Sequence, residues 1–373
     1  MSDLSSVAIL GTDSPQLPVD WYFDPRIYEI EKRVFFERGP GYVGHELMVP
    51  NAGDYQALEW MGNAKALVRN ERGIELLSNI CRHRQAVMLQ GRGTVRNIVC
   101  PLHRWTYALD GRLLGAPQFA QNPCLDLARS NLTAWNGLLF AGQRNVAHDL
   151  AQLGVSRELD FSGFVFDRVE IDEYACNWKT FIEVYLEDYH VEPFHPGLGN
   201  FVDVRDLKWE FGDWYSVQTC GVKRSLARPG SSVYQRWHDQ VLRYGKGGAN
   251  GQGGEPEHGA IWLTYFPNIM VEWYPHSLVV STLIPRGPEA CTNVVEFYYP
   301  EEIALFERDF VEAEQAAYRE TAVEDAEIIA RMTAGRRALM QQGVTESGPY
   351  QSPLEDGMQH FHSFIRRELE PHL

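Results

Sequence analysis

The spacing of hydrophobic and polar residues changes along the chain. In residues 41–142, short apolar runs are interrupted at short intervals by Gly, Asn and Asp. Such spacing is typical of short strands joined by tight turns, so it predicts a small antiparallel β domain. Ahead of this region, Asp24 and Pro25 precede a run with helical spacing at residues 28–36. An Asp cap followed by Pro predicts that a short helix begins there.

The second half of the chain mixes two periodicities. Residues 164–175 alternate as a strand does, residues 178–190 have helical spacing, and apolar runs that predict further strands follow at residues 260–284. Apolar residues, Phe306 among them, then recur at helical spacing through residues 301–342, which predicts one long amphipathic helix or two. The expected fold class is α+β, with an all-β N-terminal domain ahead of a domain built on an antiparallel sheet and a long C-terminal helix.

These changes divide the chain into three parts. Residues 1–40 form an N-terminal arm and helix that we expect to pack on the C-terminal domain, residues 41–150 form the β domain, and residues 151–373 form the larger domain. Glycine is concentrated between Gly245 and Gly259. That composition suits a surface loop, either a tolerated insertion or a lid over a site.

Composition narrows the class of protein. The chain has 34 Lys and Arg against 50 Asp and Glu, a net charge of −16, which is poorly suited to contacting nucleic-acid phosphates. It contains no apolar run of the roughly 20 residues that a membrane helix needs. The N-terminus lacks the basic start and apolar stretch of a secretory signal. We therefore expect a cytoplasmic protein that binds neither nucleic acid nor membrane.

Two short Cys/His motifs lie in the expected β domain. Cys81 and His83 are separated by one residue, Cys100 and His103 by two, and 16 residues lie between the motifs. Each motif offers one thiolate and one imidazole, which suits a tetrahedral zinc ion or a Rieske 2Fe–2S cluster, in which two cysteines bind one iron and two histidines the other. Structural zinc sites usually pair Cys with Cys and His with His. The mixed motifs therefore favour the cluster, with zinc and coincidence as alternatives.

A second group of possible ligands surrounds Pro193. Glu187, His190 and His195 lie close together in the sequence, but on a continuous helix the two imidazoles would point about 140° apart. Pro193 disfavours a continuous helix, so the chain can turn and bring the imidazoles together. Two imidazoles with one carboxylate form the facial triad of non-haem Fe(II) oxygenases. Taken alone, the pair is better explained as two unrelated surface or core histidines, but the neighbouring Cys/His motifs reverse that preference in favour of iron.

The two motifs and the Asn-Trp-Lys segment at Asn177 resemble the catalytic α subunit of the Rieske non-haem iron oxygenases over nearly the whole chain. The resemblance implies a Rieske domain followed by a helix-grip (START-like) catalytic domain. It implies a 2Fe–2S cluster and a mononuclear Fe(II) held by His190, His195 and an acid on the C-terminal helix. We assign that acid to Asp325, with Glu324 as the competing choice.

Further expectations come from the same resemblance. It implies a homotrimer in which Glu187 bridges His190 to His103 of the neighbouring subunit and so connects the cluster to the iron. Relatives that attack arenes usually have Asp at this position, whereas Glu is similar to the branch that acts on choline, glycine betaine and carnitine. The resemblance also implies that Leu102, Gln85 and Arg104 depart from the usual motifs, which carry Tyr, Gly and Gly there. Loss of the Tyr predicts loss of a hydrogen bond to a ligand sulfur and a lower cluster potential.

The resemblance implies a terminal oxygenase of a multicomponent system that uses O₂ to hydroxylate or demethylate a small organic substrate, with a quaternary amine as the favoured class. We expect the electrons to come from NAD(P)H through a separate reductase, with or without a ferredoxin, because the chain has no GxGxxG fingerprint. An aromatic ring-hydroxylating mono- or dioxygenase is the alternative. Outside the class, a Rieske electron carrier or a zinc-stabilised binding protein remains open.

The strand region that lines the iron pocket in relatives is rich in aromatic residues. They are Trp262, Tyr265, Phe266, Trp273 and Tyr274. Such rings can hold a trimethylammonium group by cation–π attraction, stack on an aromatic substrate, or belong to the core.

Overall fold

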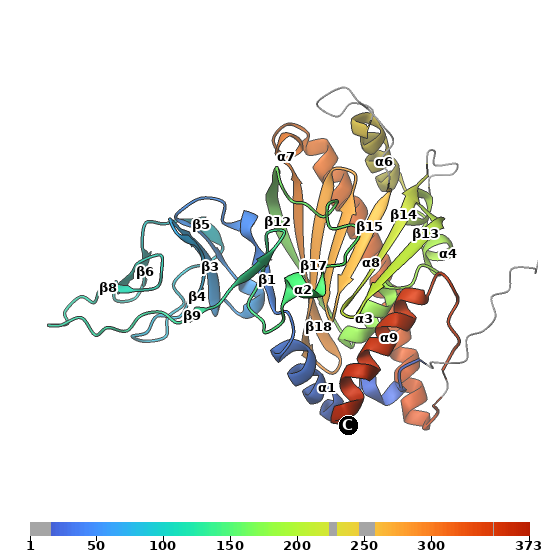
Figure 1. The fold of residues 1–373 in the computed structure, drawn as a ribbon, viewed down its shortest axis with the longest axis horizontal. Coiled ribbons are helices and arrows are strands. Elements are labelled where there is room, and N and C mark those ends of the chain that lie inside the picture. Colours follow the sequence, from blue (N-terminus) through green and yellow to red (C-terminus); the bar gives the residue numbers. More distant parts are fainter. Residues whose placement is uncertain (1–15, 224–229, 246–257, 346) are drawn as a thin grey trace, which may run out of the picture. The chain divides into compact units, whose positions relative to one another are not determined.

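The computed structural model describes residues 16–223, 230–245, 258–345 and 347–373. The chain folds into two compact units (Figure 1). One is Glu37–Ala147, and the other combines the segment up to Phe36 with His148–Leu373. Most of the glycine-rich stretch, for which a loop or lid is expected, lies outside the described residues, as does most of the N-terminal arm.

The smaller unit consists of three small antiparallel sheets, as the short apolar runs predict. Their strand orders are β5-β2-β3-β4-β9, β6-β7-β8 and β1-β11-β10. The elements are β1 (Tyr42–His45), η3 (Glu46–Met48), β2 (Asp54–Ala57), η4 (Glu59–Met61), β3 (Lys65–Asn70), β4 (Gly73–Ser78), β5 (Arg92–Thr94), β6 (Ile98–Val99), β7 (Thr106–Tyr107), β8 (Leu113–Gly115), β9 (Arg129–Ser130), β10 (Thr133–Trp135) and β11 (Leu138–Phe140). Cys81 and Cys100 are buried in the apolar core of this unit.

The larger unit is built on a seven-stranded antiparallel sheet with the order β12-β18-β17-β16-β15-β14-β13. Its strands are β12 (Phe164–Tyr174), β13 (Val202–Gly212), β14 (Tyr215–Val222), β15 (Ala260–Tyr265), β16 (Ile269–Tyr274), β17 (Ser277–Gly287) and β18 (Ala290–Pro300). Its helical elements are η1 (Val19–Tyr22), α1 (Pro25–Glu31), η2 (Lys32–Glu37), α2 (Val146–Asp149), α3 (Trp178–Tyr185), α4 (Val191–Phe194), α5 (Leu198–Phe201), α6 (Ser232–Gly245), α7 (Glu301–Phe306), α8 (Arg308–Gln342), α9 (Asp356–Leu369) and η5 (Glu370–His372). No helix of the described residues is long and apolar enough to cross a membrane.

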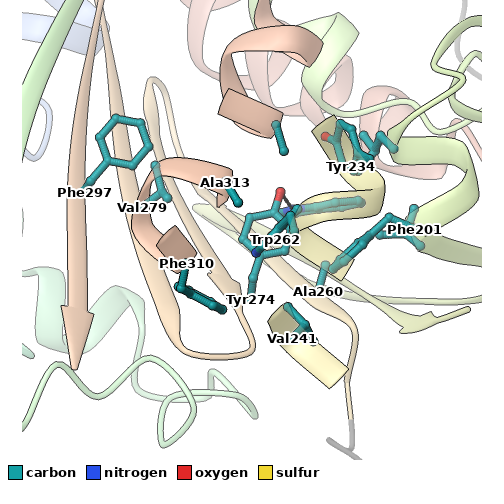
Figure 2. Packing of buried hydrophobic residues seen from close by; sticks show 14 of the residues in the cluster. Phe201, Tyr234, Val241, Ala260, Trp262, Tyr274, Val279, Phe297, Phe310 and Ala313 are labelled. Carbon is teal, nitrogen blue, oxygen red and sulfur yellow. Dashed lines mark hydrogen bonds between the residues drawn. The ribbon is translucent and has the colours of Figure 1, made fainter. Parts of the chain in front are cut away.

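The amphipathic region 301–342 forms two helices, and α8 packs on one face of the sheet. Phe310 and Ala313 of α8 join a buried cluster with Val279 of β17 and Phe297 of β18 (Figure 2). Phe306 departs from the prediction, because α7 ends at this residue and its side chain is 78% exposed. The apolar stripe of α8 thus fixes which side of that helix faces the sheet.

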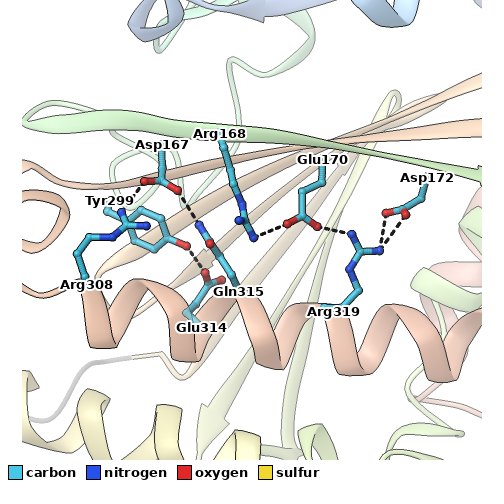
Figure 3. A network of polar contacts seen from close by, with 9 residues as sticks. All are labelled: Asp167, Arg168, Glu170, Asp172, Tyr299, Arg308, Glu314, Gln315 and Arg319. Carbon is cyan, nitrogen blue, oxygen red and sulfur yellow. Dashed lines mark hydrogen bonds and ion pairs between the residues drawn. The ribbon is translucent and has the colours of Figure 1, made fainter.

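A row of polar contacts also joins α8 to the edge strand β12 (Figure 3). Arg308 lies 2.7 Å from Asp167, and Arg319 lies 2.8 Å from Asp172. Exposed ion pairs of this kind contribute about 1 kcal/mol or less each. Because the two ion pairs lie at successive positions along both elements, they nevertheless align α8 with β12. This alignment helps to position Asp325, which lies further along α8.

The helix expected over residues 178–190 is shorter than its spacing predicts. Asn177 caps α3, its side chain accepting the N–H of Lys179 at 3.0 Å, but the helix ends at Tyr185. Beyond it, the N–H of Asp188 donates to the carbonyl of Leu354 at 2.8 Å and not to the preceding turn. This long-range hydrogen bond diverts the backbone, so Glu187 and His190 lie in the segment between α3 and α4 and not on a continuous helix.

Candidate metal centres

The two Cys/His motifs form matching turns. The N–H of Cys81 donates to the carbonyl of Ala86, and the N–H of Cys100 donates to that of Trp105. Each turn contains a left-handed residue at the same place, Gln85 with φ 55° and Arg104 with φ 60°. These are the positions at which relatives carry Gly, which adopts positive φ without strain. Gln85 and Arg104 therefore alter the side chains around the turns but keep the turn geometry.

The four side chains of these turns separate into two buried thiols and two more accessible imidazoles. Cys81 and Cys100 are each 1% exposed, whereas the Nδ1 atoms of His83 and His103 face each other at 3.2 Å near the surface. Only one group among the described residues brings three His, Cys, Asp or Glu ligand atoms within 4.8 Å of one another, and it contains none of these four. The donors therefore do not converge on one ion. Two thiolates at one end and two imidazoles at the other fit a two-iron cluster.

Tyr107 is a neighbour of the cluster turns that the sequence motifs do not reveal. Its hydroxyl lies 3.7 Å from Sγ of Cys81 and accepts the N–H of Arg82 at 3.2 Å. Burial raises the pKa of Tyr107, so the hydroxyl keeps the proton that it can donate to sulfur. A hydroxyl from β7 thus lies beside a ligand sulfur, and the effect expected from Leu102 on the cluster potential stays a prediction.

The second centre brings together His190, His195 and Asp325. The two Nε2 atoms are 3.0 Å apart, and Oδ1 of Asp325 lies 3.5 Å from Nε2 of His190 and 3.0 Å from Nε2 of His195. The histidines flank the short helix α4, and Asp325 comes from α8. Oδ1 of Asp325 is buried and has no hydrogen-bond partner. Two imidazoles and a carboxylate that converge without satisfying one another fit a divalent iron.

Further carboxylates hold the outer side of each imidazole. Nδ1 of His190 lies 2.6 Å from Glu187, and Nδ1 of His195 lies 2.7 Å from Glu324. Burial lowers the pKa of His190, but Asp325 and Glu187 outweigh it and raise that pKa to about 10. The centre therefore has an excess of negative charge that favours a bound cation. Such outer contacts also fix each ring so that its Nε2 faces the position that an iron ion would occupy.

A cavity of about 100 Å³ opens beside this second centre. Its walls include three acids that are not part of the ligand group, Asp188, Glu272 and Glu314. Burial raises the pKa of each of them to about 8. Trp237, Trp262 and Tyr274 are among the aromatic walls. The cavity is therefore both acidic and aromatic.

Only some of the aromatic residues expected to line the iron pocket lie in the wall of this cavity. Trp262 and Tyr274 line the cavity, whereas Tyr265, Phe266 and Trp273 do not. Successive residues of a strand point to opposite faces, which turns Tyr265 and Trp273 away from α8. The hydroxyl of Tyr265 donates to Asp149. Phe266, just beyond β15, packs against Phe361 and Phe364 of α9.

Two family descriptions account for most of the chain. "Ring hydroxylating alpha subunit (catalytic domain)" matches residues 156–370, and "Rieske [2Fe-2S] domain" matches residues 40–130. The chain belongs to the ring-hydroxylating α-subunit family of Rieske oxygenases. It is therefore an oxidoreductase that carries a Rieske cluster and a mononuclear iron and receives electrons from a separate reductase. Both alternatives outside this class, the electron carrier and the zinc-stabilised binding protein, are excluded.

Similar Rieske oxygenases include amine hydroxylases. A putrescine 2-hydroxylase of Ralstonia nicotianae is 61% identical over 99% of this chain and 100% of its own length. A putrescine 2-hydroxylase of Bordetella bronchiseptica is 54% identical over 99% of this chain and 88% of its own length. The chloroplastic choline monooxygenase of Atriplex hortensis is 26% identical over 95% of this chain and 78% of its own length.

The fold of this Rieske oxygenase is similar to that of a quaternary ammonium Rieske monooxygenase of known structure. The TM-score is 0.71 with 18% identity, and 96% of each chain is covered. That structure is described as giving insights into carnitine oxidation and inter-subunit electron transfer. At this identity the likeness concerns the fold alone. It agrees with the expected Rieske β domain and catalytic domain built on an antiparallel sheet.

Proposed function

We propose that this Rieske oxygenase hydroxylates a short diamine of the putrescine type. The observation that carries the proposal is the similarity to putrescine 2-hydroxylases over the full length of the chain. The acids of the cavity support it independently. Asp188, Glu272 and Glu314 place buried acids around the space next to the candidate iron ligands, and a bound dication would favour the charged, carboxylate form of these acids.

The other two substrate classes have weaker support. An aromatic hydrocarbon would bring no charge to offset the acids of the cavity, and likeness to aromatic dioxygenases is limited to the fold. A quaternary amine brings a positive charge, and choline monooxygenases are relatives. Their identity of 26% is nevertheless far below the 61% of the putrescine enzyme.

We assign the metal ligands from the geometry of the two centres. Cys81, Cys100, His83 and His103 would hold the cluster, and His190, His195 and Asp325 would hold the iron. The iron, once bound there, would supply the O₂ chemistry of the reaction, in which O₂, two electrons and two protons convert one C–H bond of the substrate to C–OH and release one water. The chain's own residues position the substrate: the aromatic walls exclude water, and the acids orient the ammonium groups.

Glu187 is proposed to connect the cluster of one subunit to the iron of another. It contacts Nδ1 of His190, and the proposed partner is the exposed His103 of a neighbouring copy in a homotrimer. The inter-subunit electron transfer named for the structurally similar monooxygenase supports this arrangement. We further propose that the trimer works in the cytoplasm, where the reductase, with or without a ferredoxin, has access to NAD(P)H.

The experiment offers the purified enzyme, a surrogate reductase and NADH several substrates under ¹⁸O₂. Putrescine is expected to give a hydroxylated diamine that carries one ¹⁸O atom, with O₂ uptake matched to product. Choline, carnitine and naphthalene serve as the alternatives. Labelled product from one of these alone, with none from putrescine, would overturn the proposal.

A control on the cluster assignment uses the same preparation. His83→Ala and His103→Ala should each abolish the visible absorbance of the Rieske cluster. Either variant with a normal spectrum would remove that residue from the ligand set.

A further inference from the structure

Glu272 is a carboxylate in the middle of the larger sheet. It lies on β16, opposite Trp262 of β15 and Val279 of β17, and is 4% exposed. The charged groups that act on it are other acids, Asp325 and Glu314, and no Lys, Arg or His of the described residues offsets it. Burying an unpaired carboxylate is costly. Its place in the wall of the cavity therefore requires a reason other than packing.

Two aromatic side chains hold this carboxylate in one orientation. The indole N–H of Trp262 donates to the hydroxyl of Tyr274 at 2.8 Å, and that hydroxyl donates to Oε2 of Glu272 at 2.9 Å (the first of these contacts is drawn in Figure 2). All three residues line the cavity. Oε1 of Glu272 accepts no hydrogen bond from the described residues. The carboxylate is thus fixed at one oxygen and left with an acceptor at the other.

Other walls of the same cavity carry hydrogen-bond acceptors without partners. Oε1 of Gln218, Oδ1 of Asn293 and Oδ2 of Asp188 are buried and accept no hydrogen bond. All three residues line the cavity. Buried polar atoms in folded proteins are nearly always hydrogen-bonded. A set of unpaired acceptors therefore indicates a ligand that brings donors, and a primary ammonium brings three.

We propose that Glu272, oriented by Tyr274 and Trp262, binds an ammonium group of the substrate and selects primary over trimethylated amines. This inference rests on the proposed function, because it names the residue that recognises the diamine. A primary ammonium can donate to Oε1 of Glu272 at hydrogen-bond distance. A trimethylammonium has no N–H, and its methyl groups keep the charge further from the carboxylate. Cation–π attraction to Trp237 and Tyr274 is open to both and does not distinguish them.

The sheet offers a matched control on its other face. Glu296 of β18 is 1% exposed, and its Oε2 accepts the hydroxyl of Tyr298 at 2.6 Å, as Glu272 accepts that of Tyr274. Glu272 is registered with Val279, and Glu296 with the next residue, Val280. Neighbouring strand residues point to opposite faces, so Glu296 faces away from the cavity. It is not among the lining residues.

The test compares Glu272→Gln and Glu296→Gln in the enzyme loaded with cluster and iron. Calorimetry without reductase measures the Kd of putrescine and of its analogue trimethylated at both nitrogens. Glu272→Gln should weaken putrescine binding at least about thirtyfold, as expected for loss of a buried charge partner. Binding of the analogue should change much less, so the preference for putrescine falls. Glu296→Gln should leave both Kd values within about threefold.

Each outcome separates this inference from the function on which it rests. If the wild type does not hydroxylate putrescine, the proposed function fails. If the wild type does and Glu272→Gln binds putrescine as tightly, only the role of Glu272 is overturned. Should Glu272→Gln lose its cluster absorbance or iron, Tyr274→Phe replaces it, since this variant removes the donor to Oε2 and the acceptor of the Trp262 indole N–H but keeps the aromatic ring. A well-folded Tyr274→Phe enzyme with unchanged Kd and unchanged preference would equally refute the proposal.

Discussion

Nδ1 of His190 lies 2.6 Å from Oε1 of Glu187, on the side of the imidazole opposite the atom that faces the candidate iron position. The other carboxylate oxygen of Glu187 accepts the backbone N–H of His190 at 3.1 Å. Glu187 therefore fixes both the ring and the turn that carries it. A corresponding contact joins His195 to Glu324, which allows the two carboxylates to be compared.

Glu187→Gln should keep the cluster and the iron but lower turnover about 10- to 100-fold, the usual effect of losing an outer partner of a metal ligand. If Glu187 also bridges two subunits, reoxidation of the reduced cluster in a single turnover should slow by the same factor. Glu324→Gln is the control, because it alters the other histidine without touching the bridge. Cluster reoxidation at the wild-type rate in Glu187→Gln would contradict the bridging role.

Asp325→Ala should lose the mononuclear iron and all hydroxylation but keep the visible spectrum of the cluster. Its Oδ1 is the only carboxylate oxygen that reaches Nε2 of both histidines among the described residues. Glu327→Ala serves as the control, because it removes an exposed acid of the same helix that pairs with Arg331, and it should retain iron. Iron bound in stoichiometric amount by Asp325→Ala would shift the third ligand to Glu324.

Local spacing explains which parts of the two centres could be predicted from the sequence. The cluster turns are defined by a few consecutive residues, so the motifs of Cys81 and Cys100 suffice to place them. His190 and His195 are likewise separated by one short helix. Asp325 is different, because acids are common on α8 and only a family resemblance distinguishes it. The end of α3 could not be predicted, since it depends on a hydrogen bond from Asp188 to the distant Leu354.

The residues that the sequence did not reveal depend on contacts between segments that are not adjacent in the sequence. Tyr107 meets the sulfur of Cys81 because their turns fold side by side, and no spacing rule joins the two positions. Glu272 carries a weak signal of its own, a single acid in an otherwise apolar strand. A buried strand seldom includes an unpaired charge, so such an acid can be singled out before the structure is known.

Tyr107→Phe should retain the cluster but lower its reduction potential. The hydroxyl is placed to donate to Sγ of Cys81, and hydrogen bonds to ligand sulfur favour the reduced, more negative cluster. A net value of about 0.5–1.5 kcal/mol for one hydrogen bond corresponds to roughly 20–65 mV for a one-electron couple. Redox titration followed by EPR measures the shift. Tyr55→Phe is the control, because it removes a hydroxyl that donates to the carbonyl of Gln90, and it should leave the reduction potential unchanged. An unchanged reduction potential in Tyr107→Phe would contradict the hydrogen bond to Cys81.

Glu183 joins three elements of the larger unit in a buried polar cluster. Its carboxylate lies 2.6 Å from the guanidinium of Arg336 and 2.9 Å from Nε2 of His362, and it accepts the hydroxyl of Tyr22. Burial by itself raises the pKa of Glu183, but Arg336 and His362 outweigh it and lower that pKa to about 2 from an ordinary 4.5. The carboxylate is therefore charged in the folded protein well below the pH at which it is neutralised in the unfolded chain.

The lowered pKa predicts how stability depends on pH. A group whose pKa falls on folding stabilises the protein fully above its unfolded value, here 4.5, and loses this contribution as the pH falls toward 2. The contribution is roughly 3 kcal/mol. Glu183→Gln should lower the free energy of unfolding at pH 7 by about 3–5 kcal/mol, because Arg336 is left buried without its partner. Denaturant unfolding of variant and wild type at matched pH should show this difference shrinking below pH 4.5, whereas Glu327→Gln on the exposed face of α8 should show none. A difference that stays constant from pH 7 to pH 3 would contradict the assigned ion pair.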